Sequence, residues 1–363
     1  MKIDFANLQK HYRLHQEEID TAIHAVMEKC NFIMGEEVAQ LESALASYVG
    51  VKHAITCSSG TDALQLALMG IDIQPGDEVI TTPFTFIATA EMIAHLGAVP
   101  VFVDIDEATY AIDASKIEEK ITPKTRAIIP VSLYGQTADM DAINAIASRH
   151  GLSVIEDAAQ SFGATYKGKK SCALSDIGCT SFFPAKPLGC FGDGGALFTD
   201  NDALAEKIRS LRVHGQSKRY HHRYIGIGGR LDTIQAAVLL VKLRHYENDL
   251  ALRQEVARKY DAALAGRYSI PFIAPERTSA YAQYSIRVRN RDTLQEELNN
   301  AGIPTAVHYP MPLHLQECFA YLGYKKGDFP ISERVANEIL SLPMNPFLGD
   351  DEIAYICGKF CID

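Results

Sequence analysis

Short apolar runs alternate with amphipathic segments of helix length between residues 53 and 199. Runs of strand length lie at 53–57, 78–82, 99–103, 127–133, 153–155, 178–183 and 195–199. Segments of helix length at 62–70, 88–96, 115–120 and 139–150 separate most of these runs. This alternation predicts an α/β fold with an open, mostly parallel sheet covered by helices on both faces. Ligands of such sheets bind beyond the carboxyl ends of the strands, so functional residues are expected there.

Helical periodicity continues on both sides of this region. Apolar residues recur at spacings of three and four before residue 28 and again between 36 and 48; Phe32 lies in the break between these helices, where a packing role is the simplest reading. A long helical pattern at 231–264 leads into a smaller unit with a strand at 283–288 and a helix at 292–300. We therefore expect a large domain over 1–245, with a helical arm at 1–50, and a small C-terminal α/β domain over 246–363.

The composition narrows the classes of function. The chain has 363 residues and a formal net charge of −10, which argues against general nucleic-acid binding because phosphate neutralisation needs a basic face. No apolar run is long enough to span a bilayer and no secretory leader precedes the first polar residues, so a cytoplasmic protein without a membrane partner is expected. The eight cysteines include no CxxC pair, so reduced thiols and no metal site are expected.

The segment Ser58-Ser59-Gly60-Thr61-Asp62 follows a predicted strand and opens a predicted helix. Free backbone N–H groups at a helix N-terminus bind phosphate, and the Thr61 hydroxyl adds a donor. The same residue types also form ordinary helix caps, and no Gly-Lys-Ser/Thr follows to complete a P-loop. Ser181, near the end of a later strand, is expected to donate to the same anion.

Lys186 lies at the exit of an apolar strand, in the segment Ser181-Phe182-Phe183-Pro184-Ala185-Lys186. A desolvated lysine loses its proton more readily and condenses with aldehydes. The ordinary alternative is a surface lysine whose amine reaches water. The presence of Asp157 and of the glycine–threonine turn at 60–61 favours the chemical role.

Asp157 closes another buried strand, where a carboxylate needs a cationic partner to stay ionised. Its neighbour Glu156 is expected to face away or to cap a helix. Phe86 follows the second strand, where an aromatic ring either covers a planar heterocycle or packs in the core. An amine, a carboxylate, an aromatic ring and a phosphate cradle together match the needs of pyridoxal 5′-phosphate (PLP), whose aldehyde binds lysine and whose ring nitrogen pairs with an acid.

At this point the chain resembles the DegT/DnrJ-type nucleotide-sugar aminotransferases, which have the aspartate-aminotransferase-like fold (PLP fold type I). The resemblance covers nearly the whole chain, and its most specific motifs lie at 60–64, 75–79, 156–160, 181–186 and 230–237. It implies that Lys186 binds the cofactor aldehyde, that Asp157 pairs with the ring nitrogen, and that Phe86 stacks on the ring. It further implies that Gln160 lies by the ring hydroxyl. The residues implied to hold the phosphate are Gly60, Thr61 and Ser181.

Members of the family are homodimers, and the resemblance implies that the loop before Arg230 completes the site of the other subunit. Gly228 stands where many relatives carry an asparagine. The side-chain contact that this asparagine makes is therefore expected to be replaced by a backbone N–H or a water.

Further motifs are similar to those of family members that use L-glutamate to aminate C3 of UDP-2-acetamido-2-deoxy-3-oxo-glucuronate for surface polysaccharides such as O-antigen. These motifs lie at 32–35, 131–136, 186–190, 214–222 and 304–310. The basic segment 212–223 offers counter-charges for a uronate and a diphosphate, although an ordinary solvated loop has the same composition. The residues expected to contact the substrate are Phe32, His214, Arg219, Arg230, His308 and Tyr309.

Three alternatives remain open at this stage. Related dehydratases of keto-sugars carry a histidine in place of the lysine, and Lys186 argues against that activity. An aminotransferase for another keto-sugar, for instance a 4-oxo sugar, is the main alternative. A cofactor-binding regulator without catalysis is the third, and the intact pair of Lys186 and Asp157 disfavours it.

Overall fold

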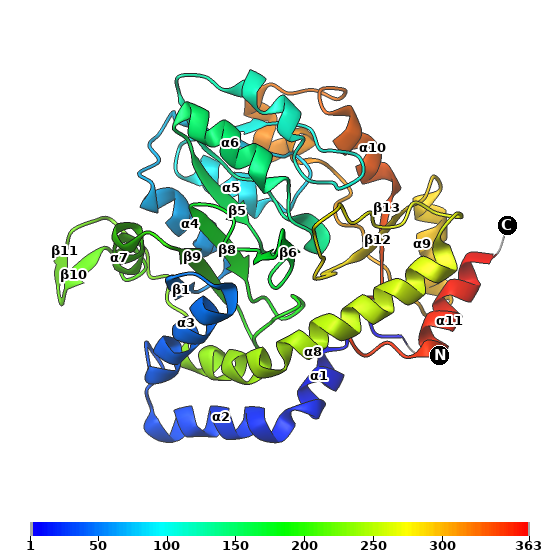
Figure 1. Cartoon of the computed structure of the whole chain (residues 1–363), viewed down its shortest axis with the longest axis horizontal. Helices are drawn as coiled ribbons and strands as arrows, with labels where there is room; N and C mark the ends of the chain where they lie inside the picture. Colours follow the sequence, from blue (N-terminus) through cyan, green and yellow to red (C-terminus); the bar gives the residue numbers. More distant parts are fainter. Residues whose placement is uncertain (1–2, 362–363) are drawn as a thin grey trace.

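The computed structural model describes residues 3–361 and is built around a seven-stranded sheet (Figure 1). In spatial order the strands are β1 (His53–Cys57), β9 (Gly195–Thr199), β8 (Ile177–Ser181), β5 (Ser153–Asp157), β4 (Thr125–Ile128), β2 (Glu78–Thr81) and β3 (Val99–Phe102). Neighbouring strands are parallel except at β9, which runs antiparallel to both β1 and β8. The mostly parallel sheet predicted from the apolar runs is therefore confirmed.

The fourth predicted strand is shorter than expected. β4 ends at Ile128 rather than at residue 133 because Pro130 has no N–H to donate to the ladder. The Pro130 carbonyl instead accepts from the Asp157 N–H (2.9 Å), and Val131 forms an isolated bridge with Asp157. This irregular pairing lies beside the end of β5, where a functional site was expected.

Helices cover both faces of the sheet, because successive strand residues point to opposite sides. On one face, α4 (Gly60–Gly70), α5 (Ala88–His95) and α7 (Asp202–Leu211) pack on a layer that includes Ile55 and Ile155. On the other face, α3 (Glu36–Val49) and α8 (Thr233–Leu264) pack near Ala54, and α6 (Met140–His150) packs on Val154. The predicted helix at 115–120 is instead two 3₁₀ turns, η1 (Ala114–Lys116) and η2 (Glu118–Lys120). An α-helix of six residues would leave most of its backbone N–H and C=O groups without a partner inside the helix.

The N-terminal arm lies along the first half of α8 (Figure 1). α1 (Leu8–Leu14) and α2 (Gln16–Lys29) precede α3, and Ile19 of α2 is buried against Val238 and Val241 of α8. Phe32 lies in the link between α2 and α3, as expected, and it is 45% exposed.

A separate core forms around the second half of α8. The antiparallel pair β12 (Tyr284–Arg287) and β13 (Ile339–Leu342) packs there with α9 (Arg291–Asn300) and α11 (Asp350–Gly358). Ile3, near the start of the chain, belongs to the same core. The buried apolar side chains of α10 (Pro330–Glu338) pack instead with Phe84 and Val131, which follow strands of the large sheet. The predicted boundary between residues 245 and 246 falls inside α8, and the division into two domains stays a prediction.

The remaining elements are short. Two hairpins are formed by β6 (Thr165–Tyr166) with β7 (Lys169–Lys170) and by β10 (Gln216–Lys218) with β11 (His221–His222), and the second projects away from the body of the molecule (Figure 1). Short 3₁₀ segments occur at η3 (Leu133–Gly135), η4 (Leu313–Leu315), η5 (Glu317–Leu322) and η6 (Lys359–Cys361). The seven cysteines whose side chains are described are free thiols. Within residues 3–361, no helix has the length and apolar character needed to cross a membrane.

Candidate active site

The carboxyl ends of β1, β2, β5 and β8 surround a cavity of about 490 Å³. The residues that line the cavity follow different strands, and a loop from the C-terminal unit, the part of the chain that follows α8, closes it. Nine of the residues expected to contact cofactor or substrate line it: Gly60, Thr61, Phe86, Asp157, Gln160, Ser181, Lys186, His308 and Tyr309. A larger cavity of about 730 Å³ in the C-terminal unit contains none of them and is lined largely by charged side chains, several already paired, such as Arg287 with Glu338.

Lys186 occupies a turn that begins just after β8. The Lys186 N–H donates to the Phe183 carbonyl (2.8 Å) and closes this turn. Gly189 lets the chain return closely, because a Cβ there would lie 2.5 Å from the Pro184 carbonyl oxygen. Burial lowers the pKa of the Lys186 ammonium, and the Asp157 carboxylate opposes this shift. The amine therefore deprotonates more readily than an exposed lysine, as a reaction with an aldehyde requires.

Asp157 is the last residue of β5 and is 6% exposed. Its carboxylate accepts hydrogen bonds from the Thr89 hydroxyl (2.7 Å) and the Ala159 N–H (3.2 Å). Burial raises the pKa of Asp157, while these hydrogen bonds and Lys186 act in the opposite direction. A positively charged group in the cavity would stabilise the ionised carboxylate, because a buried charge is costly without a partner.

The N-terminus of α4 forms the polar end of the cavity. Ser59 caps the helix by accepting from the Asp62 N–H (3.0 Å), and the N–H groups of Gly60 and Thr61, in the first turn, have no partner within the helix. A Cβ at Gly60 would lie 2.6 Å from the Ser181 Cβ, so only glycine allows α4 and β8 to approach this closely. Two N–H groups, the Thr61 hydroxyl and the Ser181 hydroxyl thus share one small region suited to an anion.

Aromatic and amide side chains form the remaining wall. The rings of Phe86 and Tyr309 lie 6.0 Å apart at 42°, and Phe86 is 54% exposed, so one face of its ring is open. Gln160 donates from Nε2 to the Tyr309 hydroxyl (3.2 Å) and accepts from the Tyr134 N–H (2.8 Å). Burial lowers the pKa of His308 to about 4, and Lys186 adds to this shift, so the imidazole is neutral at pH 7. Burial also raises the pKa of Tyr309, which keeps its hydroxyl protonated.

Four residues expected to contact the substrate do not line this cavity. Phe32 lies beside the start of α8, where its carbonyl accepts from the Thr233 N–H (2.9 Å). Arg219 is exposed on the β10–β11 hairpin, with its guanidinium 5.2 Å from the Tyr220 ring. The other two, His214 and Arg230, flank the loop that contains Gly228. The substrate roles of these four residues stay predictions.

The basic segment 212–223 is not uniformly exposed. Arg212 is only 3% exposed, donates to the Thr56 carbonyl (2.7 Å) and pairs with Glu42 on α3. It therefore stabilises the contact between α3 and β1 and is unavailable to a substrate. The residues that follow it, from His214 onward, remain mostly exposed.

A side chain at Gly228 would contact the imidazole of His214. A Cβ at this position would lie 3.0 Å from His214 Cε1 and 3.1 Å from His214 Nε2. An asparagine would therefore require the imidazole of His214 to shift. The neighbouring Gly229 carbonyl accepts from the Ser58 N–H (3.1 Å), which ties this loop to the start of the phosphate-type cradle.

The sequence analysis did not identify Thr89 or Tyr134, which hold Asp157 and Gln160 in position, or the polar residues Thr85, Asp193 and Gln283, which also line the cavity. Thr89 follows Phe86 by one helical turn, so its hydroxyl can reach the end of β5, and that spacing was the available signal. Tyr134 orients Gln160 through a backbone N–H, for which a sequence gives no signal.

Comparison with known proteins agrees with this geometry. The sequence profile described as the DegT/DnrJ/EryC1/StrS aminotransferase family matches residues 13–361. The chain is 53% identical to the UDP-2-acetamido-2-deoxy-3-oxo-D-glucuronate aminotransferase of Pseudomonas aeruginosa, over 98% of this chain and 99% of that protein.

Two solved structures are also similar over nearly the whole chain. DesV of S. venezuelae in complex with a ketimine intermediate has a TM-score of 0.97 at 40% identity, covering 99% of this chain and 97% of that one. The ntda protein of Bacillus subtilis with bound cofactor PMP has a TM-score of 0.92 at 32% identity, covering 99% of this chain and 84% of that one. These similarities confirm the expected fold class. With its profile match, its close relative and its strand-end cavity in agreement, this chain belongs to the DegT/DnrJ/EryC1/StrS aminotransferase family.

Proposed function

We propose that this chain is a PLP-dependent aminotransferase that moves an amino group from L-glutamate to C3 of a UDP-linked 3-oxo sugar. The acceptor we propose is UDP-2-acetamido-2-deoxy-3-oxo-D-glucuronate, and the product is UDP-2-acetamido-3-amino-2,3-dideoxy-D-glucuronate. The observation that carries the proposal is the meeting of Lys186, Asp157 and the N-terminus of α4 around one cavity. The choice of acceptor is supported by the 53% identity to the P. aeruginosa enzyme.

The donor set of the cavity fits PLP. Lys186 Nζ would hold the aldehyde carbon, and the Asp157 carboxylate, which needs a positive partner, would hold the ring nitrogen. The open face of Phe86 would cover the ring, and Gln160 would lie by its hydroxyl. The first turn of α4 and Ser181 would bind the phosphate. When bound, this cofactor takes the amino group from the donor and passes it to the acceptor carbonyl carbon.

Lys186 is the residue we assign to proton transfer. Its lowered pKa allows Nζ to take a proton from the α-carbon of glutamate and, in the second half of the reaction, to deliver one to C3 of the sugar. Asp157 is held in place by Thr89 and the Ala159 N–H, so the position of its carboxyl group is set before the reaction begins. Paired with the ring nitrogen, this carboxylate would keep that nitrogen positive and so stabilise the negative charge that develops at the reacting carbon.

As part of the same proposal, the enzyme is a homodimer whose subunits complete each other's sites. Phe32, Ile33 and Met34 are 45%, 51% and 40% exposed, and Ile225 is 94% exposed. Exposed apolar groups of this kind mark protein interfaces. In this arrangement His214, Arg219 and Arg230 would reach the partner's cavity and supply counter-charges to the diphosphate and the uronate. We also propose a cytoplasmic location and a role in O-antigen synthesis.

A panel of nucleotide sugars tests the function. The PLP-loaded protein is incubated with L-glutamate and with 3-oxo and 4-oxo UDP-sugars, and aminated products are detected by mass spectrometry. We expect product from the 3-oxo glucuronate and far less from 4-oxo sugars. Product from the 4-oxo sugars alone would move the reaction to the other carbon, and no product from any sugar, with no loss of glutamate, would refute the enzymatic role.

A further inference from the structure

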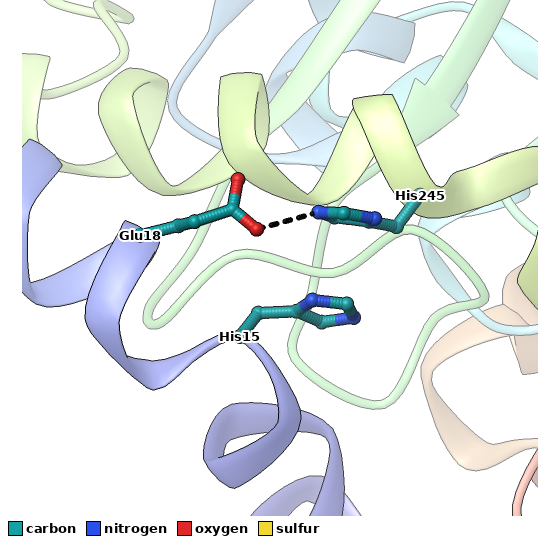
Figure 2. Close-up of side chains that lie close together, drawn as sticks. All are labelled: His15, Glu18 and His245. Atoms are coloured by element: carbon teal, nitrogen blue, oxygen red, sulfur yellow. Dashed lines mark hydrogen bonds and ion pairs between the residues drawn. The ribbon is translucent and has the colours of Figure 1, made fainter.

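A second cluster of chemically active side chains lies outside the cavity, where the N-terminal arm packs on α8 (Figure 2). His15 is the N-cap residue of α2, Glu18 lies in the first turn of the same helix, and His245 projects from α8. One ligand atom of each residue lies within 4.8 Å of the others. None of the three residues lines the cavity described above.

The geometry of the cluster brings one donor atom of each residue close together. The imidazoles of His15 and His245 stack with centroids 3.9 Å apart and an interplanar angle of 18°, and one nitrogen of each ring lies on the side of the pair that faces Glu18 (Figure 2). His245 Nε2 lies 3.0 Å from Glu18 Oε1. Within the described part of the chain, neither ring nitrogen of His15 has a hydrogen-bond partner, so its lone pair is available.

The cluster is partly open to solvent. The side chains of His245 and Glu18 are 33% and 43% exposed, so an ion can enter and water can complete its coordination. Two imidazoles and one carboxylate are a donor set that zinc and neighbouring divalent metals accept.

We propose that His15, Glu18 and His245 form a binding site for a divalent transition-metal ion of the zinc type. The ion takes the place of the N–H proton between His245 Nε2 and Glu18 Oε1, and His245 keeps its proton on Nδ1. Arg244 donates to the other carboxylate oxygen of Glu18 (2.7 Å), so it fixes that side chain but also places a competing positive charge nearby. Bound metal would fasten the N-terminal arm to α8, a link between residues 227 positions apart.

Cobalt titration tests the site, because Co²⁺ takes the same ligands as zinc and absorbs visible light. The PLP-loaded, chelator-treated protein is titrated with Co²⁺ at wavelengths away from the cofactor band, and Zn²⁺ is then added to displace it. We expect saturation near one ion per chain and displacement by Zn²⁺. Thermal unfolding in the presence of Zn²⁺ should shift to a higher temperature, because the ion binds the folded state.

Substitutions assign the ligands. His15→Asn keeps a residue that can cap α2, and His245→Gln keeps a polar side chain on α8, so both variants should fold. Each should weaken Co²⁺ binding by about tenfold or more. His24→Asn is the matched control, because His24 is an exposed histidine of the same helix that bonds only the Asp20 carbonyl, and it should leave binding unchanged. Arg244→Gln should tighten binding by roughly two- to fivefold, since it removes the competing charge.

The outcomes separate a metal site from a simple ion-pair cluster. Saturable binding that is lost in His15→Asn and strengthened in Arg244→Gln supports the site. If Co²⁺ does not saturate, or if the His15→Asn and His24→Asn proteins bind it equally, the cluster is only a set of stacked and paired side chains. Neither result depends on whether the sugar chemistry is assigned correctly.

Discussion

Strand β5 ends in two adjacent carboxylates that face opposite sides of the sheet. Asp157 faces the cavity with two protein donors, from Thr89 and Ala159, and with Lys186 nearby. Glu156 faces away and accepts from the hydroxyls of Ser132 (2.8 Å) and Ser171 (2.7 Å) and from the Cys172 N–H (2.8 Å).

Burial raises the pKa of both carboxyl groups, so burial alone does not distinguish a functional acid from a structural one. The two carboxylates differ in whether they face a cavity. Glu156 is surrounded by hydrogen-bond donors from the folded chain, whereas Asp157 lines a cavity that also contains an amine. A functional carboxylate is therefore recognised by the open space on one side of it, where a ligand can bind.

Lys186→Ala is the strongest test of the cavity side. Loss of the amine removes both the group that binds the cofactor aldehyde and the proton-transfer group, so the transamination rate should fall by about 10⁴-fold or more. The visible absorption band of the purified protein should also disappear. Turnover at the wild-type rate in this variant would show that Lys186 has no part in the chemistry, and would contradict the assignment of the cavity as the active site.

Asp157→Asn should have the next largest effect. The amide is nearly isosteric but carries no charge, so the ring nitrogen would lose its partner and kcat should fall by about 10²- to 10³-fold. The measurement is the steady-state rate of 2-oxoglutarate formation at saturating glutamate and keto-sugar. A variant with wild-type kcat would show that Asp157, like Glu156, serves only the fold.

His308, which lines the cavity, makes the free energy of unfolding depend on pH. Its pKa is about 4 when folded and 6.5 in a free chain, so the unfolded state binds the proton more readily between these values. The associated stability is present above pH 6.5 and is lost as the pH falls toward 4, by roughly 3 kcal/mol. Urea unfolding at pH 7 and pH 4 should therefore show a smaller loss in His308→Gln than in the wild type, whereas His24→Gln should behave like the wild type.

Glu156→Gln tests the opposite face and should have the smallest effect. An amide cannot accept from all three donors, so one buried donor is left unpaired and the free energy of unfolding should fall by about 1–3 kcal/mol. The kcat of the folded variant should stay close to that of the wild type. A large loss of kcat with unchanged stability would contradict the assignment of Glu156 to the fold.

Much of the cavity was predictable because its residues follow strands. The apolar runs fix where β1, β5 and β8 end, and parallel strands bring those ends to one edge, so Lys186 and Asp157 could be expected to meet. The direction of β9 was not predictable, since an apolar run has no polarity. The burial of Arg212 could not be predicted for another reason. Its partner Glu42 lies 170 positions away, and a run of basic residues does not indicate which of its members is buried.

The long helix α8 has a consequence for how the cavity opens. It runs unbroken for 32 residues, about 48 Å, with Tyr246 in the core beside the sheet and Tyr260 in the core of the C-terminal unit. His308 and Tyr309 approach the cavity from that C-terminal side. Because no loose linker separates the two cores along α8, any swing of the C-terminal unit must bend this helix or carry it along as a lever. The packing of α1 and α2 against the first half of α8 then limits how far this helix can move.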